Sequence, residues 1–190
     1  MQKTVAILLA ALVLTLSGCA KSPQQVRLSP NITVDSYVSN QPTVYLTITD
    51  NRPSKSLGTR GGVYRGTNDI TLSKDLTSTL RPVATAALNE MGVIVDDPSP
   101  KPIKLELIVE KLEYKVNENQ TLPIEVSLHT KISAIADSDG KQQATQYQSS
   151  KLHKFFTAPN AEDNATIINE IVSETLTRLF NDPKLVSLLR

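Results

Sequence analysis

Apolar residues recur along this chain with two different periods, which predict strands in some segments and helices in others. Residues 43–50 alternate, with Val44, Leu46 and Ile48 on one face, and predict a half-buried strand. Three later segments alternate in the same way: 103–116, 124–136 and 142–156. Asp139-Gly140 favours a two-residue hairpin turn, so these segments predict a three-stranded antiparallel meander. The last segment is the most polar and is expected to be an edge strand.

A helical period appears in two segments, about 76–91 and 161–179. Ser73 is the expected N-cap of the first helix and Gly92 its C′ residue, and Pro82 predicts a kink at 78–82. Asn160 is expected to cap the second helix. Asp182-Pro183 has the N-cap and N1 pattern that opens a last short helix.

The alternation in 103–116 changes phase part-way. Apolar residues occupy odd positions from Ile103 to Val109 and even positions from Leu112 to Val116. One extra residue between Ile108 and Lys111 reconciles the two halves, so the pattern predicts a β-bulge there. Shorter strands are expected at 63–65, 70–72 and 93–95.

Two amphipathic helices and several one-sided strands predict an α+β fold. We expect a two-layer sandwich, with a largely antiparallel β-sheet and two main α-helices on one face. The folded unit is expected to be a single domain over residues 43–190. Residues 19–42 are expected to form a tether, of which the part from Val26 to Pro42 lies across the body as an irregular or edge segment.

The N-terminus has the features of an export signal. Lys3 precedes Thr4–Leu16, thirteen uncharged residues that are too few to span a bilayer core of ~30 Å. Leu16-Ser17-Gly18-Cys19 resembles the bacterial lipobox, which implies cleavage after residue 18 and lipidation of Cys19. By the same resemblance, Ala20 favours the outer membrane, with the domain on the periplasmic face. Several acyl chains on one residue would make a stable membrane anchor.

Composition excludes some classes of function. The chain has 20 basic and 19 acidic side chains, and cleavage after residue 18 would remove one basic residue, Lys3, so the two signs balance. A nucleic-acid-binding protein would show a basic excess, and none is expected as a partner. Cys19 is the sole cysteine, so no disulfide forms within the chain.

Residues for catalysis are few. His129 and His153 are the only histidines, both lie in predicted strands, and no third ligand stands at metal spacing. The acidic residues are scattered singly on solvent faces, and no hydrolase or phosphate-loop motif occurs. The sequence therefore predicts a protein that is not an enzyme and holds no metal or cofactor.

The most unusual group of charges follows the first predicted strand, in loop 50–65. Arg52, Lys55 and Arg60, with flexible glycines between them, are candidates to bind an anion such as a phosphate, a sugar acid or a lipid headgroup. The alternative is local, with Asp50 pairing with Arg52. Phe155-Phe156 likewise has two interpretations, an exposed contact patch or burial under the second helix.

Several motifs together resemble the YajG family of uncharacterised bacterial outer-membrane lipoproteins. They are the lipobox, Leu28-Ser29-Pro30-x-Ile32, Asp50-x-Arg52, Ser73-x-Asp75-Leu76 and Glu90-Met91-Gly92. The resemblance implies a lipid-anchored periplasmic domain and supplies no catalytic residues. The resulting hypothesis is a non-catalytic module that binds an envelope protein or a second copy of itself. The alternative is binding of an anionic envelope ligand, lipopolysaccharide or a cell-wall fragment, through Arg52, Lys55 and Arg60.

Overall fold

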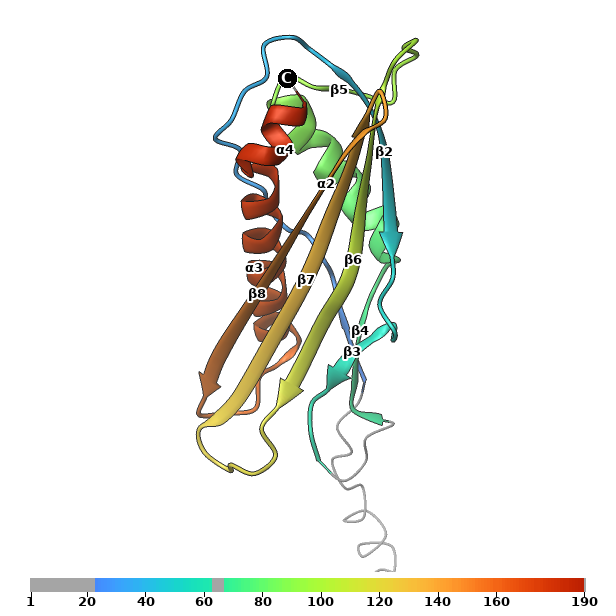
Figure 1. Cartoon of the computed structure of the whole chain (residues 1–190). Helices are drawn as coiled ribbons and strands as arrows, with labels where there is room; N and C mark the ends of the chain where they lie inside the picture. Colours follow the sequence, from blue (N-terminus) through green and yellow to red (C-terminus); the bar gives the residue numbers. More distant parts are fainter. Residues whose placement is uncertain (1–22, 63–66, 190) are drawn as a thin grey trace, which may run out of the picture.

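The computed structural model of the protein describes residues 23–62 and 67–189. The export signal, Cys19 and the strand expected at 63–65 lie outside these residues. The described chain forms one strand-rich sheet with two long helices beside it (Figure 1). The strands are β1 (Gln24–Val26), β2 (Thr43–Asp50), β3 (Ser56–Thr59), β4 (Asp69–Leu72), β5 (Ile94–Val95), β6 (Ile103–Val116), β7 (Ile124–Ser138) and β8 (Lys141–Phe155). The helices are α2 (Leu76–Glu90), α3 (Ala161–Phe180) and α4 (Pro183–Leu188).

The sheet is mixed, so the expectation of a largely antiparallel one is confirmed only in part. Strands β6, β7 and β8 form the predicted antiparallel meander, and β8 pairs only with β7, as expected of an edge strand. Strand β2, however, runs parallel to β6 and to β5, and β1 runs parallel to β4. The helix α2 lies between β2 and β6 in the sequence. A strand that returns through a helix enters the sheet parallel to the first strand.

The predicted bulge in β6 is confirmed. The register of β6 against β7 shifts between Val109 and Lys111, so that Val109 pairs with Ile132 and Lys111 with Lys131. Odd-numbered apolar residues before the shift and even-numbered ones after it are buried, which keeps both halves of the strand facing the helices. The bulge therefore places Leu112 and Tyr114 in the core.

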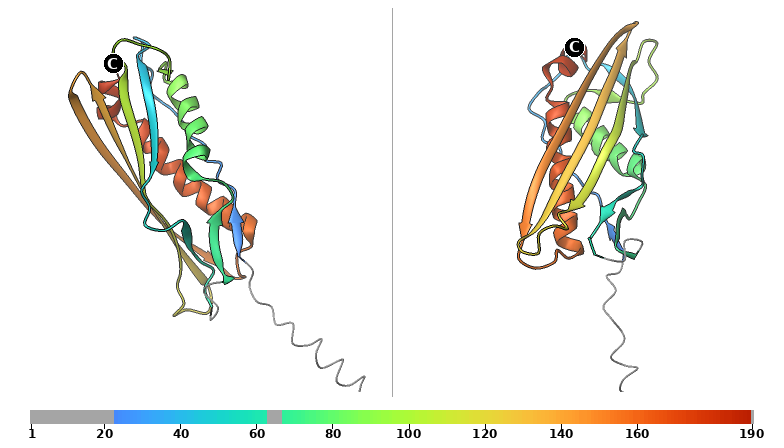
Figure 2. Two further views of the ribbon diagram at one scale, coloured as in Figure 1. Left: turned by 90° about the vertical axis from the view of Figure 1, so that its right-hand side faces the viewer. Right: turned by 60° about the horizontal axis from the view of Figure 1, so that its bottom comes forward.

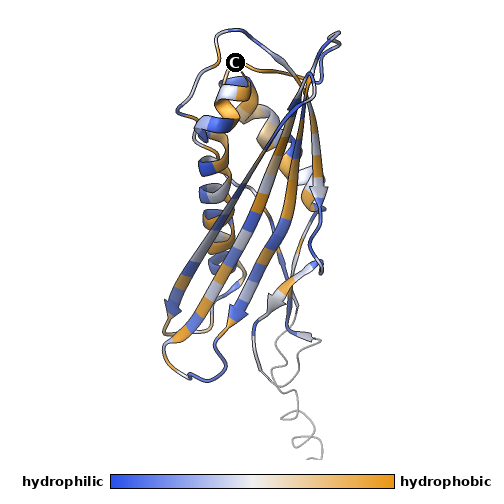
Figure 3. Ribbon diagram, in the orientation of Figure 1, coloured by the Kyte–Doolittle hydropathy of each residue, from blue (hydrophilic) through white to orange (hydrophobic). Residues whose placement is uncertain are grey.

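Both long helices lie on the same side of the sheet (Figure 2). Helix α2 packs on β2, and α3 packs on β7 and β8. Along the strands, hydrophobic and polar residues alternate (Figure 3), and the buried apolar side chains form one continuous core. The fold is thus α+β with two main helices, and the opposite face of the sheet carries polar pairs such as Lys131–Glu110 and Lys154–Glu125.

Helix boundaries agree with the sequence except at one cap. Helix α2 is a single helix that contains Pro82, and its N-cap is Asp75 instead of Ser73. The Asp75 carboxylate accepts hydrogen bonds from the N–H groups of Thr77 and Ser78, which a carboxylate does better than a hydroxyl because it is charged. Helix α3 has a capping box formed by Asn160 and Asp163, and Asp182 caps α4.

Residues 24–42 pack on the body, so the domain begins before the predicted boundary at residue 43. Strand β1 joins the sheet beside β4, and Val26, Leu28, Ile32 and Val38 are buried. Residues 26–42 thus lie across the body, as expected, whereas Gln24 and Gln25, expected in the tether, belong to a strand. The apolar residues of this segment are few and irregularly spaced, but the four buried ones belong to the continuous core.

Residues 27–42, which we call the strap, are held by a series of polar side chains on α3 and on its C-cap residue, Asn181. The backbone N–H groups of Ser29, Asn31, Thr33 and Asp35 donate to the side chains of Asn169, Ser173, Thr177 and Asn181, respectively. Two residues of extended chain advance ~6.6 Å and four residues of helix advance ~6 Å, so the two series stay in step. Farther along, the N–H of Val38 donates to the carbonyl of Met91, which ties the strap to the end of α2.

Candidate functional site

Two of the three predicted anion-binding residues meet on one carboxylate. Arg52 donates to both oxygens of Asp50, through Nε at 2.8 Å and Nη2 at 2.9 Å, and Lys55 Nζ lies 2.7 Å from Asp50 Oδ2. The Arg52 guanidinium holds the pKa of Asp50 far below its usual range, Lys55 acts in the same direction, and burial opposes both. The local pairing expected as the alternative is thus present. It leaves the Lys55 side chain as the exposed cation of the cluster, since the Arg52 side chain is buried.

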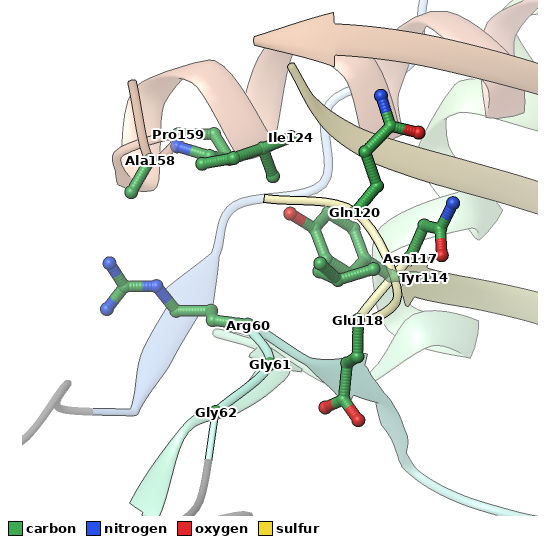
Figure 4. Close-up of a pocket in the computed structure, with 11 residues that line it drawn as sticks. Arg60, Gly61, Gly62, Tyr114, Asn117, Glu118, Gln120, Ile124, Ala158 and Pro159 are labelled. Atoms are coloured by element: carbon green, nitrogen blue, oxygen red, sulfur yellow. The ribbon is translucent and has the colours of Figure 1, made fainter. Parts of the chain in front are cut away.

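Arg60 lies elsewhere, at a pocket formed by the ends of several strands. The pocket has a volume of about 470 Å³, which is within the range of small-molecule sites. Strand β3 leads to Arg60, β6 supplies Tyr114 and Val116, β7 supplies Ile124, and the β8–α3 connection supplies Ala158 and Pro159 (Figure 4). Its lining is therefore mixed, with apolar side chains from β6, β7 and the β8–α3 connection and polar ones from Arg60, Asn117, Glu118 and Gln120.

Tyr114 is the most unusual residue of this pocket. The residue is 1% exposed, yet within residues 23–62 and 67–189 its hydroxyl has no hydrogen-bond partner. Figure 4 shows the hydroxyl directed into the space between Arg60 and the side chains of Ile124 and Pro159. Burial raises the pKa of Tyr114 well above its usual range, although the positive charge of Arg60 acts against the shift. The hydroxyl therefore stays protonated and available as a donor.

Glycine makes the pocket possible where β3 meets β6. Gly58 pairs with Tyr114, and a Cβ on Gly58 would lie 1.9 Å from the Tyr114 carbonyl oxygen. Only a residue without a side chain allows this approach, and its φ of 151° is one that glycine accepts readily. The close approach sets the start of the segment that carries Arg60 to the pocket wall.

A second hollow, of about 680 Å³, lies beside the first and reaches the Asp50 cluster. Arg52, Ser56, Lys111 and Lys115 are among its lining residues. In the part of the chain that the structure describes, Nη1 of Arg52 has no hydrogen-bond partner. The two hollows share Tyr114, Val116 and the start of the β6–β7 loop.

The histidines do not come together. His129 Nδ1 lies 2.9 Å from Ser150 Oγ, and His153 stacks on Phe155 with 6.4 Å between the ring centroids. Among the described residues, no group of three or more His, Cys, Asp or Glu side chains is arranged to hold a metal ion. Phe155 is partly buried against the core, whereas Phe156 is 81% exposed, so burial holds for the first residue of the pair and exposure for the second.

The sequence reasoning identified Arg60 but missed Tyr114. Tyr114 was assigned only to the alternating core of 103–116, and nothing in the sequence indicates that its hydroxyl lacks a partner. The available signal was its polar tip at an interior position next to a strand end, where a buried tyrosine normally finds a hydrogen-bond partner.

Comparison with known proteins identifies the family. The family model described as "Uncharacterized lipoprotein" matches residues 30–190. The chain belongs to this lipoprotein family. Membership implies a bacterial envelope protein held at a membrane. No curated protein matches the chain.

The fold of this lipoprotein is also found in solved structures of low sequence identity. Protein XCC0632 from Xanthomonas campestris is 15% identical, with a TM-score of 0.54, over 89% of this chain and 97% of that protein. An uncharacterized protein is 10% identical, with a TM-score of 0.51, over 85% and 99% of the two chains. Within the described parts of the lipoprotein, no helix combines the length and apolar character needed to cross a membrane.

Proposed function

We propose that this protein is a lipid-anchored, non-catalytic module that binds another envelope protein through its edge strand β8. In this proposal residues 1–18 are a cleaved signal peptide, and Cys19 carries diacylglycerol and palmitate. The domain then stands on the periplasmic face of the outer membrane, as favoured by Ala20. The lipoprotein family of the chain supports the anchor in general terms.

The observation that carries the binding proposal is the unpaired side of β8. This strand has fifteen residues, pairs with β7 alone among the described strands, and contains neither proline nor glycine. An edge strand presents backbone N–H and C=O groups that can pair with a strand from another chain. Two backbone carbonyls of β8 already accept hydrogen bonds from side chains. Gln143 Nε2 donates to the Ala144 carbonyl at 3.2 Å, and Arg178 Nη1 donates to the Gln148 carbonyl at 3.4 Å.

Charge indicates the chemistry of the partner segment. The formally charged residues of β8 are Lys141, Lys151 and Lys154, so the strand has no acidic side chain. Lys151 is already paired with Glu170 and Glu174, and Lys154 with Glu125, which leaves a polar, glutamine-rich centre. A complementary strand would be extended and polar, with an acidic residue facing Lys141. This strand can come from a different envelope protein or from a second copy of this chain, and the experiment below distinguishes the two.

Site-specific photocrosslinking in intact cells tests the proposal. A photoreactive amino acid replaces Gln148, at the centre of the β8 edge, and in a matched variant it replaces the exposed Glu90 at the end of α2. We expect one reproducible adduct from position 148 and none from position 90, and its mass distinguishes another protein from a second copy. No adduct at position 148, or the same adducts at both positions, would overturn the proposal.

A second candidate is binding of an anionic envelope ligand, lipopolysaccharide or a cell-wall fragment, through loop 50–65. The observation that favours it is the position of Arg60 at a pocket that also holds the hydroxyl of Tyr114. Arg52 and Lys55 contribute less, because both are paired with Asp50. Retention of a ligand by the wild type and by the Arg60→Ala variant, compared by native mass spectrometry, tests this candidate. Equal retention of the ligand by the wild type and the Arg60→Ala variant would refute this second candidate function.

A further inference from the structure

The pocket between Arg60 and Tyr114 has the composition of a site for an amphiphile. Val116, Ile124, Ala158 and Pro159 provide apolar wall, which favours a hydrocarbon chain. The rest of the lining is polar: Arg60, Asn117, Glu118 and Gln120 contribute side chains, and the buried Tyr114 hydroxyl points into the pocket (Figure 4). A buried hydroxyl without a partner costs free energy, and a ligand that supplies an acceptor recovers it.

The sign of the charge near this hydroxyl favours an anion. Arg60 lines the same wall, and its positive charge lowers the Tyr114 pKa while the larger effect, burial, raises it. Glu118 is the acidic residue of the lining, and in Figure 4 its carboxylate points away from the Tyr114 hydroxyl. A carboxylate or phosphate placed between Arg60 and Tyr114 would accept hydrogen bonds from both.

The position of the pocket suggests the source of such a ligand. The β6–β7 loop and the β8–α3 connection form the end of the molecule at which β1 also begins (Figure 1). These two connections expose Leu122 and Phe156, by 60% and 81%. Pro23, the first described residue, is four positions after Cys19, a span of at most ~14 Å. With the lipid on Cys19, as proposed above, this end lies against the bilayer.

We propose that the pocket binds the acyl chain of an anionic amphiphile, with the head group held by Tyr114 and Arg60. The membrane location of this binding rests on the proposed lipidation of Cys19, whereas the binding itself does not. The shared chemistry is a single hydrocarbon chain with a carboxylate or phosphate at its end. It can come from a membrane lipid or from a free fatty acid.

Photolabelling of the full-length lipidated protein tests the site. The protein is reconstituted in vesicles of phosphatidylethanolamine and phosphatidylglycerol that contain a trace of a fatty acid with a diazirine at the chain terminus. After irradiation, labelled peptides are mapped by mass spectrometry. We expect label in the pocket wall, on peptides with Val116, Ile124 or Pro159, and several-fold less label from the matching fatty alcohol.

Two variants and two controls make the result specific. Tyr114→Phe and Arg60→Gln should each lower labelling of the pocket wall several-fold, with circular dichroism showing that both variants are folded. Arg27→Gln removes an exposed charge outside the pocket lining, and Tyr37→Phe removes an exposed hydroxyl. Both controls should label like the wild type. Label confined to peptides with Leu122 and Phe156, equal labelling by the alcohol, or no effect of Tyr114→Phe and Arg60→Gln would overturn the proposal.

A second experiment tests binding in the pocket independently of the proposed lipidation of Cys19. The same diazirine fatty acid is given in solution, without vesicles, to the Cys19→Ala variant. Labelling of the pocket here supports the site even if the wild type fails to float with vesicles, a result that would refute the anchor alone. Pocket labelling of the wild type from vesicles only supports the site with the membrane as the source. No pocket labelling in either arm refutes the site and leaves the anchor untouched.

Discussion

The strap depends on α3 for its hydrogen bonds, and Asn169 is the residue whose removal tests this most directly. Its Oδ1 accepts from the Ser29 N–H at 2.6 Å, and its Nδ2 donates to the Arg27 carbonyl at 3.0 Å. In Asn169→Ala both bonds are lost, at about 0.5–1.5 kcal/mol each. Alanine has a higher helix propensity than asparagine, which offsets up to about 0.7 kcal/mol of this loss of stability. We therefore expect the free energy of unfolding to fall by about 1–2 kcal/mol.

Urea denaturation measures this change, and Asn89→Ala is the matched control. Asn89 is an exposed helical asparagine in α2, so its replacement should be neutral or slightly stabilising. Amide hydrogen exchange gives a local readout, since the Ser29 N–H should exchange faster in Asn169→Ala while amides of β7 keep their order of protection. Equal stabilities of the two variants, together with unchanged exchange at Ser29, would refute the view that α3 side chains hold the strap.

Three further changes test the pocket and one helix cap. Tyr114→Phe removes a buried hydroxyl without a partner among the described residues, so in protein freed of lipid it should raise the free energy of unfolding by about 1 kcal/mol, measured in urea; a clear loss would contradict this. Gly58→Ala should abolish folding because its Cβ meets the Tyr114 carbonyl, whereas Gly140→Ala, whose Cβ meets nothing, should fold with a modest loss, as judged by yield and circular dichroism. Asp75→Ala should cost about 1 kcal/mol at neutral pH. Hydrogen bonds from Ser78 and Thr77 lower the pKa of Asp75 from 3.8 to about 2. The stability that the Asp75 carboxylate contributes is therefore present above pH 3.8 and lost as pH falls through 2, where the free energies of unfolding of wild type and variant should become equal. A difference that stays constant with pH would contradict the role of Asp75 as the N-cap.

Local patterns predicted the elements of this fold better than their arrangement. The alternation in β6, β7 and β8 and the turn at Asp139-Gly140 are short-range features, and the observed meander follows them. The parallel pairing of β2 with β6 depends on the path through α2, which no residue pattern within either strand records. The strap was predicted to lie across the body, but the way it is held there was not predicted, for a related reason. Its amides bond to side chains about 140 residues later in the chain, and polar residues such as Ser173 and Thr177 looked like ordinary solvent-facing positions of a helix.

The pocket illustrates the same limit at the level of a single residue. The phase change in β6 predicted a bulge, and the bulge turns Tyr114 from the open face of the sheet to the face that packs against the helices. The sequence is therefore sufficient to predict that Tyr114 lies on the buried face of β6. The surroundings of the Tyr114 hydroxyl are set by two other segments. Gly58 brings β3 against β6, and the β8–α3 connection forms the opposite wall of the pocket with Pro159. These segments lie more than forty residues from Tyr114 in both directions, and an unpaired polar atom is a property of all three together. Deleting Glu110 removes the extra residue, so the alternation from Ile103 to Val116 becomes continuous and Tyr114 should stay on the face toward the helices. The Tyr114→Phe variant should keep the pocket and lose only the donor, which shows that the burial of Tyr114 and the missing partner of its hydroxyl have separate origins.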